Sequence, residues 1–292
     1  MTGTVVKGIG GFYFVDNGHE IVMGKARGNL KRDKEIIYVG DIVDFEIDQN
    51  DSDGECVINK VIERRNYLSR PPVSNLDMLV VVFSLVHPAV NFPVVDKLIA
   101  ACEQAGIEPA CCISKADLAD PDELRKAFSI YSGVFPSAAV NALSGEGIDD
   151  LTNIIKGKNV ALAGPSGVGK STISNHLLSD MDIVVATGDV SDKTRRGRHT
   201  TRHVEIFTLP DGTRLYDTPG FTSLELMETV PKEIRSLFRE FRDYDAACRY
   251  GDCMHINEPG CAVKDALANG GISQSRYESY ILMTEEAEKW VK

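Results

Sequence analysis

The chain has 292 residues and a formal net charge of -11, a length that predicts two or three domains with ample core. Its acidity excludes general nucleic-acid binding through a basic surface, so any RNA contact is expected to be local. No run of about 18 apolar residues and no signal peptide occur, so we expect no membrane partner and a cytoplasmic location. In that compartment the seven cysteines are expected to stay reduced.

Residues 1–70 predict an N-terminal all-β barrel of the OB-fold type, because short apolar or alternating runs are separated by Gly, Asp and Asn turns. The runs are residues 10–15, 19–23, 41–47 and 56–58. Barrels of this type bind oligonucleotides, and Tyr13, Lys25 and Arg27 are candidates for RNA contact. Arg70-Pro71-Pro72 interrupts the pattern and marks the first predicted domain boundary.

From residue 75 the chain alternates between strands and helices. Apolar strands are predicted over 78–85 and 107–113, and helices over 96–105 and 121–131. This alternation predicts a parallel α/β sheet.

Ser114-Lys115-Ala116-Asp117 follows the second of these strands, and the strand ends of α/β sheets are where ligands bind. The segment matches the guanine-reading motif N-K-x-D, with Ser in place of Asn. In that motif the Asp carboxylate accepts two hydrogen bonds from guanine, and adenine offers no such donor pair. Asp117 therefore predicts selection of GTP, while Ser114 can replace only part of the role of Asn in tying loops together. The alternative is an ordinary polar loop.

Asn141-Ala142 opens a segment, Val140 to Gly147, that resembles the S-A-x-x-G-x-G sequence behind the guanine base of GTPases. Asn141 stands where that sequence has Ser. The spacing after Asp117 supports a contact of Asn141 and Ala142 with the nucleotide.

A phosphate-binding loop, G-x-x-x-x-G-K-[ST], follows the apolar strand 159–163 and precedes a predicted helix over 172–178. In such a loop backbone N–H groups and the lysine cradle phosphates, and the Ser171 hydroxyl holds magnesium. The alternative is a Gly-rich turn that binds nothing. In ordinary GTPases this loop precedes the guanine-reading motif, so the reversed order predicts a circular permutation. The expected nucleotide contacts are Gly164, Pro165, Ser166, Gly167, Val168, Gly169, Lys170, Ser171 and Thr172.

Residues 193–203 contain five Lys/Arg and no acid, and they lie where switch I of a GTPase belongs. Thr200 and Thr201 are candidates for nucleotide contact, and one of them, here assigned as Thr201, is expected to bind magnesium when the γ-phosphate is present. The segment is interpreted either as a solvated basic loop or as a switch that faces RNA.

Residues 204–209 and 213–216 predict a hairpin, and Asp217-Thr218-Pro219-Gly220 follows it. This matches D-x-x-G, in which the Asp supports magnesium and the Gly N–H senses the γ-phosphate; a plain turn is the alternative. Ras-like enzymes orient water with a Gln after this motif, whereas Phe221 cannot polarise water. His199 is therefore the catalytic candidate, against the alternative of a solvated loop histidine.

Cys248-x4-Cys253-x-His255-x5-Cys261 places four potential metal ligands close together in the sequence. Three Cys and one His suit tetrahedral zinc in a closed structural site. The remaining cysteines lie in apolar strand or helix patterns and are predicted to be core residues. They are Cys56, Cys102, Cys111 and Cys112.

Taken together, SKAD, GPSGVGKS, GRHTT, DTPG and the Cys-Cys-His-Cys cluster, in this order after a small barrel, resemble the ribosome small-subunit-dependent GTPase A family. The resemblance covers nearly the whole chain. It implies three domains: an OB-fold at 1–70, a circularly permuted α/β P-loop GTPase at 71–227, and a helical zinc-binding domain at 228–292. It also implies that His199 positions the hydrolytic water and that the partners are the small ribosomal subunit, its rRNA and GTP/GDP.

We therefore expect a monomeric GTPase with one structural zinc ion and magnesium bound with GTP. Because the segment after DTPG leads into the C-terminal domain, switch motion is hypothesised to reach that domain. Two alternatives stay open: an RNA-docking protein that uses GTP only as a structural ligand, and a kinase that uses the phosphate loop. No acceptor site for a kinase is evident in the sequence.

Overall fold

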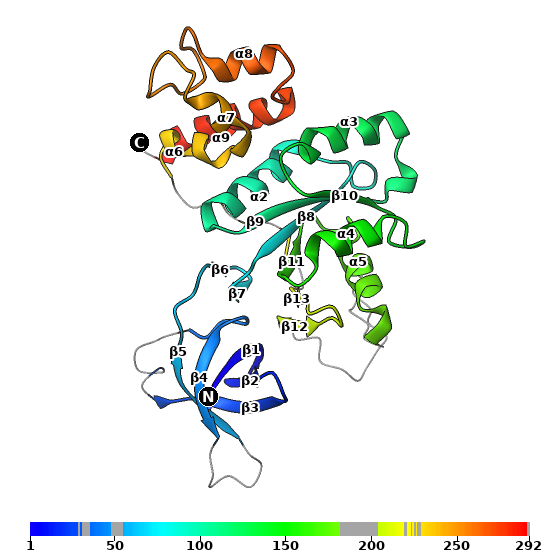
Figure 1. Cartoon of the computed structure of the whole chain (residues 1–292), viewed down its shortest axis with the longest axis vertical. Helices are drawn as coiled ribbons and strands as arrows, with labels where there is room; N and C mark the ends of the chain where they lie inside the picture. Colours follow the sequence, from blue (N-terminus) through cyan, green and yellow to red (C-terminus); the bar gives the residue numbers. More distant parts are fainter. Residues whose placement is uncertain are drawn as a thin grey trace. The chain divides into compact units, whose positions relative to one another are not determined.

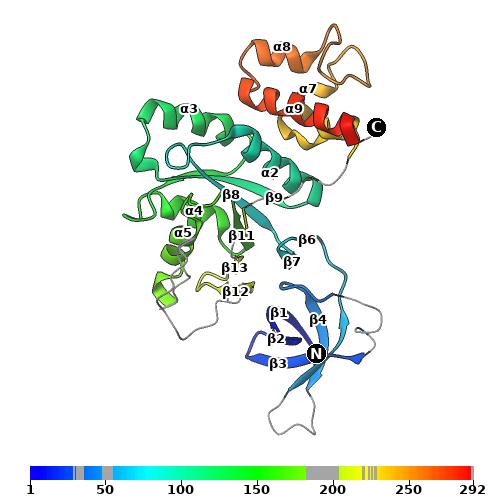
Figure 2. The ribbon, with the colours of Figure 1, turned by 180° about the vertical axis from the view of Figure 1, so that it is seen from behind.

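The computed structural model describes residues 1–28, 30, 36–47, 55–181, 204–218, 221, 222, 224, 226 and 229–290. Contacts within the chain divide it into two compact units, and each is described by itself (Figures 1 and 2). Unit 1 comprises Met1–Leu79, Ile155–Leu162 and Ser174–Phe221, and unit 2 comprises Val80–Ile154, Ala163–Ile173 and Thr222–Lys292. Each unit is thus assembled from segments that are distant in the sequence.

The N-terminal part of unit 1 is a closed five-stranded barrel, drawn in blue to cyan in Figure 1. Its strands pair in the order β1-β2-β3-β5-β4, and β4 closes the barrel on β1. Val5, Val15, Phe45 and Ile58 are buried in its core. The predicted barrel is confirmed, and β1 is the strand that the sequence analysis did not predict. The strands are β1 Thr2–Ile9, β2 Phe12–Asp16, β3 Ile21–Ala26, β4 Ile42–Ile47 and β5 Cys56–Val61.

Two hairpins and a parallel strand accompany the barrel. β6 and β7 form a hairpin whose turn is Arg70-Pro71, the predicted boundary. β12 and β13 form the hairpin that was predicted from residues 204–209 and 213–216, and β13 runs parallel to β11. β12 also pairs with β1 of the barrel, with Lys7 opposite Glu205. The strands are β6 Tyr67–Ser69, β7 Pro72–Ser74, β11 Asn159–Ala163, β12 Glu205–Thr208 and β13 Arg214–Asp217.

Unit 2 contains strands β8, β9 and β10 in the order β10-β9-β8, and β9 and β10 are parallel. Every residue of β8 is buried. Helices α2 and α3 lie on one face of these strands and α4 on the other (Figures 1 and 2). Helix α2 begins after its cap Asn91 and ends at Gly106, whose φ of 66° is left-handed. The alternation predicted from the sequence is confirmed. The elements are β8 Met78–Ser84, α2 Phe92–Ala105, β9 Glu108–Ser114, α3 Pro121–Ser132, β10 Ser137–Val140, α4 Ile148–Ile155 and α5 Lys170–Leu177.

The C-terminal part of unit 2 is helical, as predicted. Its aromatic core places Phe241 against Phe238 and Tyr280, with ring centroids 5.3 and 5.1 Å apart. Ala100 and Ala101 of α2 belong to the same buried cluster, so this part packs on α2. Within the described part of the chain, no helix has the length and apolar character needed to span a bilayer. The helices are α6 Pro231–Ile234, α7 Arg242–Asp245, α8 Ala262–Ala268 and α9 Gln274–Trp290.

Candidate functional site

The phosphate-binding loop joins β11 to α5, in the strand–loop–helix setting that the motif requires. Gly164 has a φ of 148°, and a Cβ at this position would lie 2.0 Å from the carbonyl oxygen of Val82, so only glycine fits. Lys170 Nζ donates to the carbonyls of Gly164 at 2.7 Å and Pro165 at 3.0 Å. The ammonium therefore lies against the loop, where an incoming phosphate would meet it.

Ser114, the last residue of β9, is buried and bonds to this loop. Its hydroxyl lies 2.5 Å from the carbonyl oxygen of Val168 and 3.1 Å from that of Phe83. A hydroxyl has one proton, so the shorter contact marks the bond to the phosphate-binding loop. The serine therefore does tie the two loops together, although with one donor where an asparagine has two.

Lys115 adds a second connection to the same loop. Its Nζ donates to the carbonyl of Gly167 at 2.8 Å and to that of His87 at 2.5 Å. Asp117 lies in the 3₁₀ turn Ala116–Leu118 and is exposed, free to meet a ligand. The loop after β8, which supplies the His87 carbonyl, was not predicted as part of the site. Its only signal is its place after a strand of the α/β sheet.

The segment that begins at Asn141 lies beside the guanine-reading loop. Val140 of β10 pairs with Ser114 of β9, so Asn141 and Lys115 leave neighbouring strand ends. The Asn141 carboxamide oxygen accepts from the backbone N–H groups of Leu143 and Ser144 at 3.0 and 3.3 Å. The side chain therefore shapes its own turn, and a nucleotide contact of Asn141 and Ala142 stays a prediction.

Asp217 ends β13 in unit 1 and is half-buried. It lies opposite Glu205 of β12, and Glu205 lies opposite Lys7 of β1, to which it is bonded at 2.7 Å. Burial, and then the negative charge of Glu205, raise the pKa of Asp217 to about 6. A magnesium ion near this carboxylate would favour its charged form.

Four predicted residues lie outside the described part of the chain, so their roles stay predictions. They are His199, Thr200, Thr201 and Gly220. Phe221 is described and is buried at 2% exposure. Its apolar ring therefore has no access to water, in keeping with its inability to assist hydrolysis.

The predicted metal ligands converge. One ligand atom from each of Cys248, Cys253, His255 and Cys261 lies within 4.8 Å of every other. His255 Nδ1 is 3.3 Å from Cys261 Sγ and 3.7 Å from Cys248 Sγ. In a tetrahedral site with Zn–S bonds of about 2.3 Å, sulfur atoms are about 3.8 Å apart, so the cluster has the dimensions of a metal site. The other cysteines, Cys56, Cys102, Cys111 and Cys112, are buried core residues, as predicted.

The protonation of the cluster also suits a metal. Burial, with a contribution from neighbouring Cys261, raises the pKa of the Cys253 thiol to about 12, and burial raises the pKa of Cys261. Burial lowers the pKa of His255, which keeps the ring neutral, the form that binds metals. A cation must therefore displace thiol protons, and metal affinity should fall with falling pH.

Hydrogen bonds with two side chains, those of Glu258 and Tyr277, hold the turn that contains His255. His255 has a φ of 59°, and the Glu258 carboxylate accepts from the backbone N–H groups of Met254 at 2.7 Å and Ile256 at 3.0 Å. The Tyr277 hydroxyl donates to the His255 carbonyl at 2.5 Å. Asp245 Oδ1 lies 2.7 Å from His255 Nε2, although the two atoms lack the alignment of a strong hydrogen bond. The imidazole therefore presents Nδ1 to the sulfurs.

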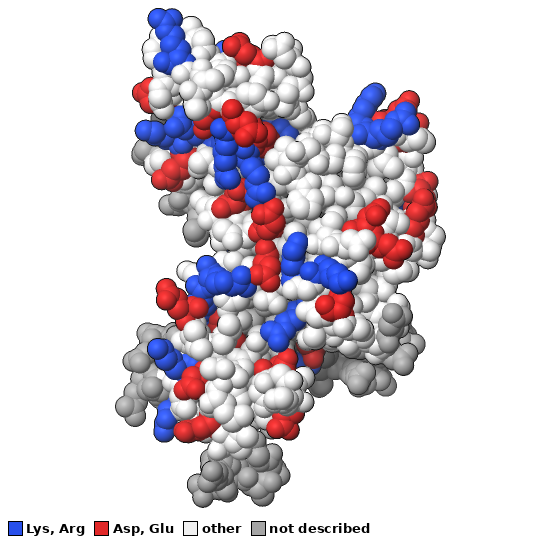
Figure 3. Space-filling model, viewed as in Figure 1, with Lys and Arg blue, Asp and Glu red and all other residues white. Residues whose placement is uncertain are grey.

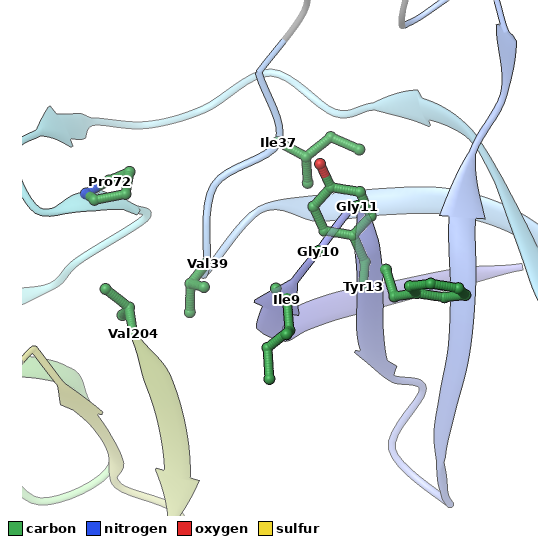
Figure 4. A pocket seen from close by; sticks show the side chains of 10 residues that line it. Ile9, Gly10, Gly11, Tyr13, Ile37, Val39, Pro72 and Val204 are labelled. Atoms are coloured by element: carbon green, nitrogen blue, oxygen red, sulfur yellow. The ribbon is translucent and has the colours of Figure 1, made fainter. Parts of the chain in front are cut away.

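A pocket of about 280 Å³ lies in unit 1 beside the β1–β2 turn (Figure 4). Tyr13 lines this pocket. Lys25 bonds to Glu55 at 3.0 Å, and Arg27 bonds to Asn59 at 2.6 Å. Among the described residues on the face drawn in Figure 3, basic and acidic side chains are interspersed. RNA contact by Tyr13, Lys25 and Arg27 stays a prediction.

A family model for the RsgA GTPase matches residues 61–227, and a model for the RsgA N-terminal domain matches residues 2–55. The chain belongs to the RsgA GTPase family. It is 40% identical to the small ribosomal subunit biogenesis GTPase RsgA of Caldanaerobacter subterraneus subsp. tengcongensis over 291 residues, which are 99% of this chain and 96% of that protein. The RsgA protein of Carboxydothermus hydrogenoformans is 42% identical over 288 residues, 98% of this chain and 97% of that protein.

Solved structures agree with the RsgA assignment. YjeQ from Thermotoga maritima matches with a TM-score of 0.81 and 34% identity over 98% of both chains. YloQ, described as a circularly permuted GTPase, matches with a TM-score of 0.80 and 27% identity over 99% of this chain and 95% of that one. The barrel, the central GTPase region and the C-terminal Cys/His cluster confirm the predicted fold class.

Proposed function

We propose that this chain is a GTP hydrolase that acts on the small ribosomal subunit during its late maturation. The nucleotide part is supported by one observation: Ser114 and Lys115 donate hydrogen bonds to carbonyls of the phosphate-binding loop, so the proposed base-reading and phosphate-binding motifs lie next to each other. The subunit part is supported by the relatives, which are named small ribosomal subunit biogenesis GTPases. We infer that rRNA contact, a monomeric state and a cytoplasmic location accompany this function.

Each residue of the site has a proposed task. Asp117 accepts hydrogen bonds from guanine, and Lys170 with the loop N–H groups neutralises phosphate charge. His199 is proposed to position the attacking water. Magnesium would offset the phosphate charge, and the residues proposed to hold it are Ser171, Thr201 and Asp217. Three thiols and one imidazole favour zinc as the metal of the C-terminal cluster, where it would be structural.

The experiment measures hydrolysis and binding of guanine and adenine nucleotides, and compares variants of two aspartates. We expect GTP but not ATP to be hydrolysed, and GDP to bind much more tightly than ADP. Asp117→Asn should weaken GDP binding by about tenfold or more, because two hydrogen bonds to the base are disturbed. Asp122→Asn is the matched control, because this exposed residue pairs with Arg125 on α3. Equal use of ATP and GTP would contradict the assignment of Asp117.

The alternative in which GTP is only a structural ligand is tested by affinity for the small subunit. A switch should bind the subunit with different affinities in its GDP form and in the form with a non-hydrolysable GTP analogue. Equal affinities would favour the docking protein.

A further inference from the structure

A buried ionic cluster joins the C-terminal helices to the GTPase region of unit 2. Arg276 of α9 is 1% exposed. Its Nε and Nη2 donate to the two carboxylate oxygens of Glu240 at 2.6 and 3.1 Å, and its Nη1 donates to Asp96 Oδ1 at 2.9 Å. The guanidinium also lies 4.6 Å from the centre of the Phe238 ring. A buried charge is tolerated only when its donors are satisfied in this way.

Asp96 of α2 is the centre of this cluster. It is fully buried and also accepts from the Tyr131 hydroxyl of α3 at 3.0 Å and from the Ser279 hydroxyl of α9 at 2.5 Å. One carboxylate thus holds three helices together. Of these, α2 precedes the strand that ends in the guanine-reading loop, and α3 follows that loop.

A second ionic contact connects the C-terminal helical part to strand β9. Glu108, the first residue of β9, accepts two hydrogen bonds from the Arg239 guanidinium at 2.8 and 3.1 Å. Arg239 also bonds to Glu103 of α2 at 2.8 Å. After its half-buried first residue, β9 is buried through to Ser114, so it is a rigid link between the Arg239 contact and the guanine-reading loop.

Resting on the proposed nucleotide function, we propose that the C-terminal domain positions the guanine-reading loop, and that Asp96, Tyr131, Arg239 and Arg276 are positioning residues for guanine recognition. Base contacts are common to GTP and GDP. Loosening the contacts between the C-terminal helices and the guanine-reading loop therefore weakens the binding of both nucleotides by the same factor. A connection through DTPG, the route hypothesised from the sequence, would instead act on the γ-phosphate and change GTP binding alone.

The experiment uses the full-length, metal-loaded protein and two mild variants, Tyr131→Phe and Arg239→Met. GDP and a non-hydrolysable GTP analogue are titrated against each. We expect both dissociation constants to rise by about fivefold at a constant ratio. Lys97→Met is the matched control, because it removes another α2–α9 contact, the partly exposed pair with Glu286 at 2.6 Å, and should leave both dissociation constants unchanged. Arg276→Met is expected to raise both dissociation constants further. If this variant does not fold, Tyr131→Phe and Arg239→Met still test the proposal.

Inosine diphosphate provides a readout that general destabilisation would not move. It lacks the exocyclic amino group that the Asp117 carboxylate is proposed to bind, so wild-type protein should prefer GDP. If Asp117 is displaced, the ratio of the dissociation constants for inosine diphosphate and GDP becomes smaller. We expect it to fall by about threefold in Tyr131→Phe and Arg239→Met.

Unchanged affinities in the folded variants would overturn the inference, as would a loss confined to the GTP analogue or an unchanged preference for GDP over inosine diphosphate. Failure of the wild-type protein to bind GDP or the analogue would instead refute the proposed function on which the inference rests.

Discussion

Replacement of Ser114 by alanine tests whether one hydroxyl joins the base-reading and phosphate-binding loops. The hydroxyl is 2.5 Å from the Val168 carbonyl oxygen, and both residues are almost fully buried, at 2% and 1% exposure. Water therefore cannot replace the lost donor, and a buried carbonyl left without a partner costs about 1–3 kcal/mol. We expect Ser114→Ala to lower the free energy of unfolding by about 1–2 kcal/mol.

The same change should weaken nucleotide binding. Without the bond, the phosphate-binding loop is less restricted in the free protein, and the nucleotide must order it. We expect the dissociation constants of GDP and of a non-hydrolysable GTP analogue to rise by about three- to tenfold. Denaturant unfolding and fluorescence titration measure the two effects separately.

Two further variants sharpen the comparison. Ser114→Thr keeps the hydroxyl and should retain most of the affinity. Ser137→Ala removes a hydroxyl that donates to the Phe135 carbonyl at 3.0 Å, at the start of β10 and away from the nucleotide loops. It should affect stability without affecting affinity. If Ser114→Ala binds GDP like the wild type, or no worse than Ser137→Ala, the reasoning is refuted.

Three other perturbations have defined outcomes. Asp245→Ala should lower metal affinity by about tenfold, measured by competition with a chromophoric chelator, because the Asp245 carboxylate, 2.7 Å from His255 Nε2, favours the tautomer with its proton on Nε2 and leaves Nδ1 for the metal; unchanged affinity would show that the imidazole needs no such support. The raised pKa of Asp217, about 6 against an ordinary 3.8, means that its ionisation opposes folding at higher pH. In magnesium- and nucleotide-free protein, Asp217→Asn should therefore be more stable than wild type by about 1–2 kcal/mol at pH 8, after allowance for partial exposure, and the difference should vanish as the pH falls toward 4; a difference independent of pH would contradict this. A double-mutant cycle of Lys7→Met and Glu205→Gln should give a coupling of about 0.5–1 kcal/mol in unfolding free energy, and a zero value would mean that this pair does not hold β1 on β12.

Local spacing explains which parts of the site could be predicted. The loop Gly164 to Ser171 and the ligands from Cys248 to Cys261 are each contained in a short stretch, so residue type and spacing suffice. The structure has Asp117 in the turn after β9, the position that the strongly apolar strand before it indicated; its contact with guanine stays a prediction. These signals depend little on the rest of the fold.

Long-range pairing explains what was missed. Arg276 and Asp96 are 180 positions apart, and each would pass for a solvated charge on an ordinary helix. The strand Thr2–Ile9 was missed because only Val5 and Val6 are buried in it, so its apolar pattern is short. Its place is decided by pairing with β2, β4 and β12.

Phosphate release from GTP and from ATP, each with and without purified small ribosomal subunits, tests the central claim most directly. The account predicts slow GTP turnover by the protein alone, because Phe221 is buried and apolar and no Gln follows DTPG. It predicts a strong rise with subunits and no turnover of ATP. GTP turnover that is indifferent to subunits would contradict the proposed partner, and equal turnover of ATP would contradict the nucleotide assignment.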